Sequence, residues 1–466
     1  MHKRTAAARL WLAGPILLIA LWLPGFDQGF PRVDVGLYAG LSKHAYDADI
    51  AQWWFLTGPE NDYFNKPPLA FWIHGFFARA VELLGGPSTG ERMWVLRFPA
   101  LIAGIICIVA TTRAVRTLSS HRTALIASIV LASSLEFFRY TKALSLDLWL
   151  CAFVMLAVSA IAAKRTTPRL AIAGACIGLA LLVKPWLALL PLAILIAWSV
   201  SLESWRILPN WLAAITAMTL VAAPWHLSML HQFGSTWTDA YIASQAVARI
   251  TSDAHGSELP YYYLSALLSW HWPWLIFTAL GVSAIITKRF PRDRAAVRLI
   301  VLWLVVWFLA LTISTDKTTR YMISTMPMLA WLAALWMVKA SPLWFARGRA
   351  RPFVGWAPWA ALLIGITIAI LGVRVHKPIP PEWTALQTTL TNNPTLAPRL
   401  TLAHPDRAAA GTLYWLTNTW PPTLDNANIP NPAILYTRPT ESERTQARTI
   451  ADPIIDQGTL LLIAPD

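Results

Sequence analysis

The chain has 466 residues, of which 56% are hydrophobic and only 13% are charged, and it contains 26 tryptophans. A soluble globular domain carries about 25% charged residues, so this composition excludes an ordinary soluble protein. A net charge of +14 could indicate a protein that binds nucleic acid. However, the basic residues gather in short loops between apolar runs, a pattern that indicates orientation in a membrane and no nucleic-acid partner.

Apolar runs of about 20 residues recur along the chain, long enough to cross a hydrocarbon core of about 30 Å as helices. The first run, residues 10–25, follows two basic residues as in a signal peptide. No small-residue cleavage site precedes the next loop, so we expect a retained helix. The sequence predicts about eleven transmembrane helices, at residues 8–25, 97–115, 122–138, 145–163, 169–184, 186–201, 207–229, 261–286, 297–314, 321–339 and 354–373.

The loops between these runs alternate between basic loops and mixed or acidic ones. The basic set includes the N-terminus and residues 113–122, 163–169 and 287–298. The positive-inside rule places this set in the cytoplasm, which predicts a multi-pass protein of the bacterial inner membrane. With an odd number of spans, the N-terminus is cytoplasmic and the C-terminal region is periplasmic.

Two domains are expected. Residues 1–374 form the transmembrane domain, in which residues 25–96 are a first periplasmic loop with juxtamembrane helices at the outer surface. Residues 375–466 form a periplasmic C-terminal domain, where short apolar pieces such as AILYT alternate with helix-like pieces such as ESERTQARTIADPI. That rhythm is typical of a small α/β domain, and a loosely ordered extension is the alternative.

Polar residues of two kinds fall in the loops of the predicted outer face. Carboxylates include Asp34 in the first loop and Asp147 in the second, and cations follow in every later one. Carboxylates beside cations at one membrane face suit an enzyme that uses a lipid phosphate. Arg139 and Lys142 are alternative, structural partners for Asp147, and Lys184 either joins the cations or only marks a helix boundary.

Several motifs occur in a fixed order along residues 8–340. They read DVGLY, NKPPLAFWIH, RFPAL, LSLDLWL, LLVKPWLALLP, APWHLSML, HWPW and KTTRYMISTMP. In this order they resemble the GT-C glycosyltransferases of the protein O-mannosyltransferase and lipid A aminoarabinose transferase superfamily. The resemblance implies a GT-C fold and transfer of a hexose or pentose, with inversion, from an undecaprenyl phosphate donor. The acceptor would be lipid A, another glycan or a protein.

The resemblance also implies roles for individual residues. Asp34 would be the base or orienting group for the acceptor, and Asp147 a second carboxylate of the site. Lys66, Lys317, Arg320 and Tyr321 would bind the donor phosphate. Tyr38, Gln245, Arg249 and His255 would contact substrate. Each has a plainer alternative: a solvated carboxylate, a helix cap, a snorkelling lysine, a tyrosine of the membrane belt or a surface histidine.

Three positions depart from the family pattern. Gln245 stands where an asparagine is usual, Ser324 stands where a proline is common, and Val35 follows Asp34 where a glutamate is usual. One carboxylate then remains there, so no cofactor is required on this reasoning, although a divalent metal stays open. The three cysteines lie in apolar runs and are expected to be packing residues.

A lipid-linked sugar flippase is the alternative function. Transporters, however, place ionisable groups near the midplane and show repeats, and neither pattern is evident here. A non-catalytic assembly partner is a third class, in which the Asp and Lys set would lack a purpose.

Overall fold

The computed structural model describes most of the chain. The described parts are residues 12–24, 26, 34–47, 53–58, 62–87, 94–242, 261–314, 317–340, 363, 366–367, 381–404, 406, 409–410, 412–413, 421–423, 432–457 and 460–464. The chain divides into two compact units. One comprises Met1–Pro24, Phe64–Leu69 and Ala100–Arg374, and the other comprises Gly25–Tyr63, Ala70–Pro99 and Val375–Asp466. The domain boundaries expected from the sequence stay a prediction.

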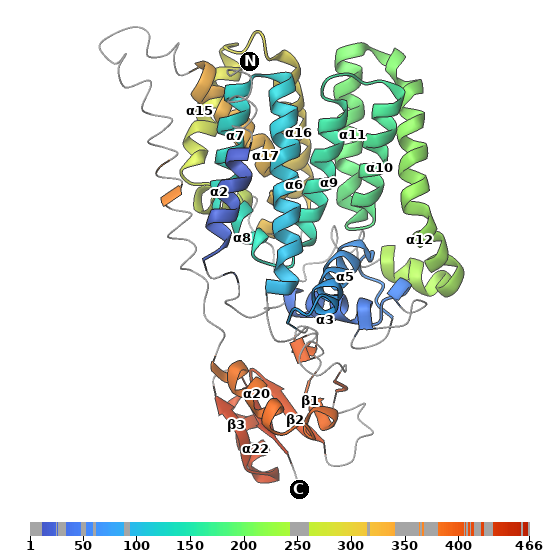
Figure 1. Cartoon of the computed structure of the whole chain (residues 1–466), viewed down its shortest axis with the longest axis vertical. Coiled ribbons are helices and arrows are strands. Elements are labelled where there is room, and N and C mark those ends of the chain that lie inside the picture. Colours follow the sequence, from blue (N-terminus) through green and yellow to red (C-terminus); the bar gives the residue numbers. More distant parts are fainter. Residues whose placement is uncertain are drawn as a thin grey trace. The chain divides into compact units, whose positions relative to one another are not determined.

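The first unit is a bundle of helices that run side by side (Figure 1). Its long helices are α6 (Trp94–Leu118), most of which belongs to this unit, α11 (Pro185–Glu203), α12 (Leu208–Ile242) and α16 (Arg294–Ile313). Its shorter helices are α2 (Ala13–Trp22), α7 (His121–Ser133), α8 (Leu135–Thr141), α9 (Leu146–Ile161), α10 (Thr167–Leu181), α14 (Tyr262–Trp270), α15 (Trp274–Ile286) and α17 (Met326–Leu335). The short turns η2 (Trp205–Ile207), η4 (Thr319–Thr325) and η5 (Trp336–Ala340) flank α12 and α17.

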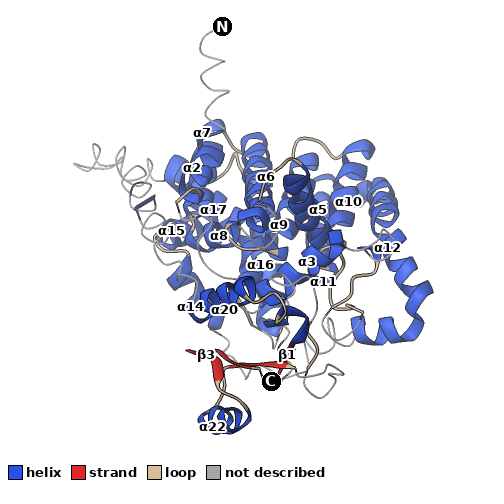
Figure 2. Cartoon of the chain, turned by 60° about the horizontal axis from the view of Figure 1, so that its bottom comes forward, coloured by secondary structure: helices blue, strands red, loops and turns tan. Residues whose placement is uncertain are grey.

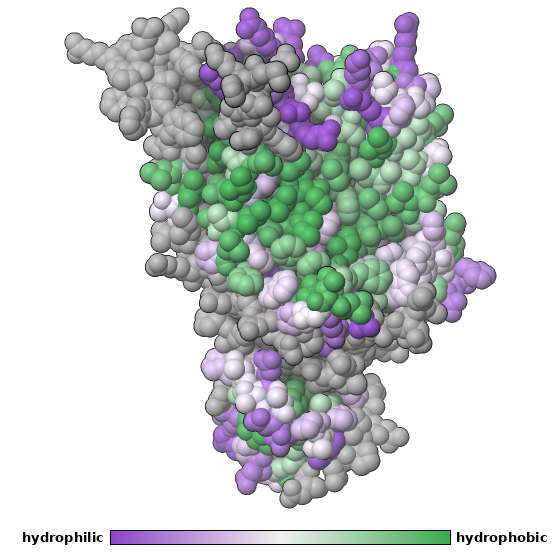
Figure 3. All heavy atoms as spheres, viewed as in Figure 1, coloured by the Kyte–Doolittle hydropathy of each residue, from purple (hydrophilic) through white to green (hydrophobic). Residues whose placement is uncertain are grey.

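Several of these helices are long and apolar enough to cross a membrane. Among the described residues there are five, or six if the bent pair α7 and α8 is one span. Figure 3 shows a belt of hydrophobic residues across the helical unit, with hydrophilic residues beyond one edge of the belt. This matches the expected class of helical membrane protein. The count of about eleven spans stays a prediction, because residues 354–373 lie largely outside the described residues.

Two expected spans are interrupted. The run 122–138 bends by 65° between α7 and α8. Ser133 and Ser134 donate hydroxyl protons to the carbonyls of Ile129 and Val130, at 2.7 and 2.8 Å, and such side-chain bonds compete with the helical ladder. The run 261–286 breaks between α14 and α15 at Pro273, which has no amide proton to continue a helix.

The second unit contains the two helices expected after the first span. They are α3 (Asp34–Asp47) and α5 (Leu69–Leu83). His74 of α5 is buried and its Nδ1–H donates to the Leu96 carbonyl at 2.6 Å. Burial lowers the pKa of His74 to about 4, so its ring is neutral at pH 7.

The C-terminal part of the second unit is a four-stranded sheet with one helix on each face (Figure 2). The strands β1 (Leu400–Leu402), β2 (Ala433–Thr437), β3 (Pro453–Gln457) and β4 (Leu460–Ile463) lie in the order β1-β2-β4-β3, and only β1 and β2 are parallel. Their side chains alternate between two apolar clusters, one beside α20 (Pro381–Asn392) and one beside α22 (Glu441–Ile450). The expected α/β character is confirmed. The expected helix over 441–454 is too long, because it ends at Ile450 and Pro453 opens β3.

Candidate functional site

An ion pair between Asp147 and Lys184 forms the centre of the candidate site. Lys184 Nζ donates to both carboxylate oxygens of Asp147, at 2.7 and 2.8 Å, and both side chains are buried. Asp147 lies in the first turn of α9, whose N-cap is the hydroxyl of Ser145, and Lys184 directly precedes Pro185 at the start of α11. Because a buried charge persists only when it is paired, this contact fixes both side chains.

A cavity of about 210 Å³ lies beside the pair. Its polar lining comes from Lys66, Lys184, Ser314 and Tyr321. Its apolar lining comes from α11 and α16, through Pro185, Trp186, Leu187, Leu190, Ala310 and Leu311. Two cations next to an apolar wall suit a ligand that joins a phosphate to a hydrocarbon chain.

Lys66 reaches this cavity from a short segment that precedes α5. The two residues that follow it, Pro67 and Pro68, are buried, and their rings restrict the backbone. The Leu69 amide then donates to the Leu182 carbonyl at 3.2 Å, which ties the segment to the end of α10. The Lys-Pro-Pro sequence therefore anchors a half-buried lysine at a cavity wall.

Tyr321 enters the cavity from η4, and two tryptophans of α16 hold its backbone. Trp307 Nε1–H donates to the Tyr321 carbonyl at 3.0 Å, and Trp303 Nε1–H donates to the Ser324 carbonyl at 2.9 Å. The two indole rings are parallel, with centroids 5.9 Å apart. Lys184 Nζ lies 5.1 Å from the centroid of the Tyr321 ring, a cation–π distance.

The other two cations expected at the donor phosphate lie in or beside η4. Arg320 places its guanidinium 5.7 Å from the centroid of the Tyr321 ring. Lys317 donates from Nζ to the Ser314 carbonyl at 3.0 Å, at the end of α16. Lys66 and Lys184 line the cavity, and Lys317 and Arg320 lie beside Ser314 and Tyr321, which also line it.

Arg139 has a partner that the sequence did not indicate. It pairs with the buried carboxylate of Glu136 at 3.2 Å, not with Asp147, and its guanidinium lies 4.2 Å from the centroid of a Trp270 ring. Lys142 donates from Nζ to the Pro24 carbonyl at 2.5 Å. The expectation that Arg139 pairs with Asp147 is therefore wrong, because a nearer carboxylate lies one helical turn before it.

The remaining predicted residues divide into two groups. Asp34 is the first residue of α3, although its side chain lies outside the described part, and Tyr38 is buried with its ring 5.5 Å from that of Phe71. Gln245, Arg249 and His255 lie outside the described residues. Within the described ranges, no group of three or more His, Cys, Asp or Glu residues could hold a metal ion.

Comparison with known proteins supports the family resemblance. The family model described as dolichyl-phosphate-mannose-protein mannosyltransferase matches residues 65–227, a range that contains Lys66, Asp147 and Lys184. The undecaprenyl phosphate-alpha-4-amino-4-deoxy-L-arabinose arabinosyl transferase of Pectobacterium atrosepticum is 26% identical over 68% of this chain and 57% of its own length. A second such transferase, from Proteus mirabilis, is 25% identical over 69% of this chain and 58% of its own. The chain spans less than two thirds of these relatives.

Solved structures share the fold. ArnT from Cupriavidus metallidurans, determined with undecaprenyl phosphate bound, superposes with a TM-score of 0.72 at 16% identity, over 99% of this chain and 98% of that one. The oligosaccharyltransferase AglB from Archaeoglobus fulgidus superposes with a TM-score of 0.63 at 13% identity, over 91% of this chain and 65% of that one. The chain has the fold of the GT-C glycosyltransferases. The resemblance inferred from the ordered motifs, to the superfamily of aminoarabinose and protein O-mannosyl transferases, is confirmed.

Proposed function

We propose that this chain is an inner-membrane glycosyltransferase that moves a sugar from a polyprenyl phosphate donor to an acceptor at the periplasmic face. The observation that carries the proposal is the cavity in which Lys66, Lys184 and Tyr321 meet an apolar wall. The names of the curated relatives support undecaprenyl phosphate as the carrier and an aminopentose as the sugar. Lipid A, another glycan or a protein hydroxyl is the acceptor class.

The reaction needs a carboxylate beside the acceptor and cations beside the donor phosphate. An acceptor oxygen attacks the anomeric carbon of the sugar, the bond from that carbon to the phosphate oxygen breaks, and the lipid phosphate leaves with the bonding electrons. A carboxylate takes the proton of the acceptor, and we assign this role to Asp34. Cations stabilise the charge that develops on the leaving phosphate, and we assign this role to Lys66 and Lys184, with Lys317, Arg320 and Tyr321 beside them.

Asp147 has a different role in this proposal. Both of its oxygens accept from Lys184, so it is not free to serve as the base. We assign it to positioning: it holds the ammonium group of Lys184 at the cavity wall. The apolar lining from α11 and α16 receives the first part of the prenyl chain.

The proposed arrangement in the membrane follows the charges. About eleven helices of residues 1–374 span the membrane, with α3 and α5 at the outer surface and residues 375–466 in the periplasm. The basic loops, among them the turn between α15 and α16, then face the cytoplasm. The cavity lies at the opposite end of α16, on the donor side.

A transfer assay with purified protein and a defined polyprenyl-phosphate sugar tests the function. Lys66→Ala is expected to raise the KM for the donor at least tenfold with little change in the KM for the acceptor, because one charge-assisted contact to phosphate is lost. Asp34→Asn is expected to abolish transfer but leave donor binding intact. Lys164→Ala, an exposed lysine in a basic loop, is the matched control. Flipping of the lipid-linked sugar without bond cleavage would support the flippase and overturn the proposal.

A further inference from the structure

A second cavity, of about 230 Å³, lies at the other end of α16, where the end of α15 meets the start of α16. Three basic side chains line it, Lys288, Arg294 and Arg298, together with apolar groups that include Ile285 and Phe290. None of the described residues that line it is acidic. This basic cavity is separate from the proposed transfer site, which borders the C-terminal end of α16.

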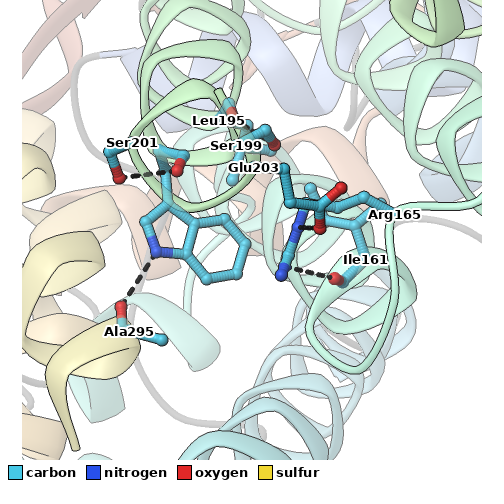
Figure 4. A network of polar contacts seen from close by, with 8 residues as sticks. Ile161, Arg165, Leu195, Ser199, Ser201, Glu203 and Ala295 are labelled. Carbon is cyan, nitrogen blue, oxygen red and sulfur yellow. Dashed lines mark hydrogen bonds and ion pairs between the residues drawn. The ribbon is translucent and has the colours of Figure 1, made fainter. Parts of the chain in front are cut away.

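Two carboxylates have partners of their own: one lies in the turn that lines the cavity, and the other lies two residues after Ser201, which Arg298 contacts. Asp293, the acidic residue of the turn, pairs with Lys339 of η5. Glu203, at the end of α11, pairs with Arg165 at 2.5 Å (Figure 4). Within the described part of the chain, neither carboxylate forms an ion pair with a cation of the basic cavity. Its positive charge is therefore available to an external anion.

The walls of the basic cavity are held in place without a ligand. Trp198 Nε1–H of α11 donates to the Ala295 carbonyl at 2.9 Å, and the Arg165 guanidinium lies 4.7 Å from the centroid of a Trp198 ring (Figure 4). Arg298 donates to the Ser201 carbonyl. These contacts fix the first turns of α16 against α11, so binding there would cost little ordering of the backbone.

Apolar surface runs from the basic cavity toward the middle of the bundle. Ile286 is 74% exposed at the end of α15, and Val282, Val301 and Val305 are exposed along α15 and α16. A ligand whose anionic group enters the cavity can therefore lay hydrocarbon along these two helices.

We propose that the basic cavity binds the phosphate of an anionic glycerophospholipid, with its acyl chains along α15 and α16. Basic pockets between transmembrane helices, at the face that carries the positive loops, are suited to phospholipid headgroups. Lys288 and Arg294 contact the phosphate oxygens, and Arg298 joins them while it holds α11. A lipid bound there links α15 to α16 and stabilises the bundle.

A lipid titration of the full chain in detergent tests the proposal. Phosphatidylglycerol, phosphatidylcholine and inorganic phosphate are added separately, and the rise in melting temperature gives an apparent Kd. Phosphatidylglycerol is expected to stabilise the protein, and the other two are not. Stabilisation by inorganic phosphate at equal concentration would assign the site to a free anion and overturn the lipid proposal.

Lys288→Gln/Arg294→Gln is the diagnostic variant, because neither side chain holds another helix among the described residues. Loss of two charges near the headgroup is expected to weaken binding of phosphatidylglycerol at least tenfold. Lys164→Gln/Arg169→Gln removes the same charge from exposed positions in another basic loop and serves as the matched control. Equal losses in the two variants would show only a general surface attraction and would refute the site.

A second measurement needs no variant. A phosphatidylglycerol analogue with a photoreactive headgroup is bound to the unmodified chain, cross-linked and mapped by peptide mass spectrometry. Labelling is expected to concentrate in residues 285–298. Labelling spread evenly over all the basic loops would contradict a built cavity.

Discussion

Asp147 and Lys184 form a buried ion pair, and variants of it can separate stability from the role proposed for Lys184. The pair is buried, so removing one member leaves the other charge without compensation, at a cost of about 3–5 kcal/mol. Replacing both members with apolar groups of similar size removes the desolvation penalty as well as the attraction. The two kinds of variant can therefore separate a structural role for Lys184 from contact with the donor phosphate.

Lys184→Met is expected to lower the free energy of unfolding by about 3–5 kcal/mol. Asp147→Leu/Lys184→Met is expected to regain most of that stability, because no buried charge remains. The double variant is still expected to use the donor poorly, since the ammonium group is absent from the cavity. Thermal melting and the donor KM measure the two effects. A stable double variant with the parent KM would remove Lys184 from the phosphate site.

The sequence predicts the residue types of the site better than their partners. The ordered motifs point to Lys66, Asp147 and Tyr321. In the structure Lys66 and Tyr321 line one cavity, and Asp147 pairs with Lys184, which lines it too. Lys184 stays ambiguous in the sequence, because its partner lies 37 residues away and no periodic pattern connects α9 to α11. The position of Lys184 in the sequence could have indicated its role. A lysine that closes an apolar run before a proline needs a counter-charge if it is buried.

At the scale of elements, the bundle depends on close contact between α10 and α12. Gly174 faces the backbone of α12, and a Cβ there would overlap the carbonyl oxygen of Ala214. Gly178, one turn later, faces the Met218 carbonyl and Val221 in the same way. Two glycines four residues apart let helices approach closely where dispersion, not the hydrophobic effect, drives association in a membrane.

Gly174→Leu is therefore expected to destabilise the protein by about 3 kcal/mol, the upper end of the usual cost of overpacking, because the backbone that it meets cannot move aside as a side chain can. Ile172→Leu, on the exposed side of the same helix, is the control and is expected to change stability by less than about 0.5 kcal/mol. Melting temperature and the yield of monodisperse protein report both. Equal melting temperatures for the two variants would mean that α10 and α12 are not tightly packed.

Apolar runs locate most helices because a span must be long and apolar, whatever its neighbours are. They do not locate the bends. The Ser133-Ser134 pair and Pro273 interrupt runs that are continuous in hydropathy, since the interruption comes from backbone hydrogen bonding. In the C-terminal sheet, the four residues LLLI of β4 alternate between two apolar clusters, and both faces are buried because a helix covers each of them. Composition alone does not reveal these two helices.

At the scale of the whole molecule, one charge asymmetry underlies both proposals. The loops that end α9, α11 and α15 are basic, and the proposed transfer cavity borders the start of α11 and the end of α16. If the basic loops face the cytoplasm, the cavity opens toward the periplasmic leaflet and the basic cavity faces the anionic cytoplasmic leaflet. One measurement of the orientation therefore tests on which side of the membrane the donor binds and which leaflet the basic cavity faces.

Cysteine labelling can determine the orientation of the chain in the membrane. Gln446→Cys places an exposed thiol on α22, and Thr167→Cys places one at the start of α10 beside the basic loop. With a membrane-impermeant maleimide, Gln446→Cys is expected to react in intact spheroplasts, and Thr167→Cys only after permeabilisation. The parent chain is the control, because Cys107 and Cys151 are buried and Cys176 is partly so. The reverse pattern would place the transfer cavity on the cytoplasmic side, where the proposed donor and acceptor would not meet.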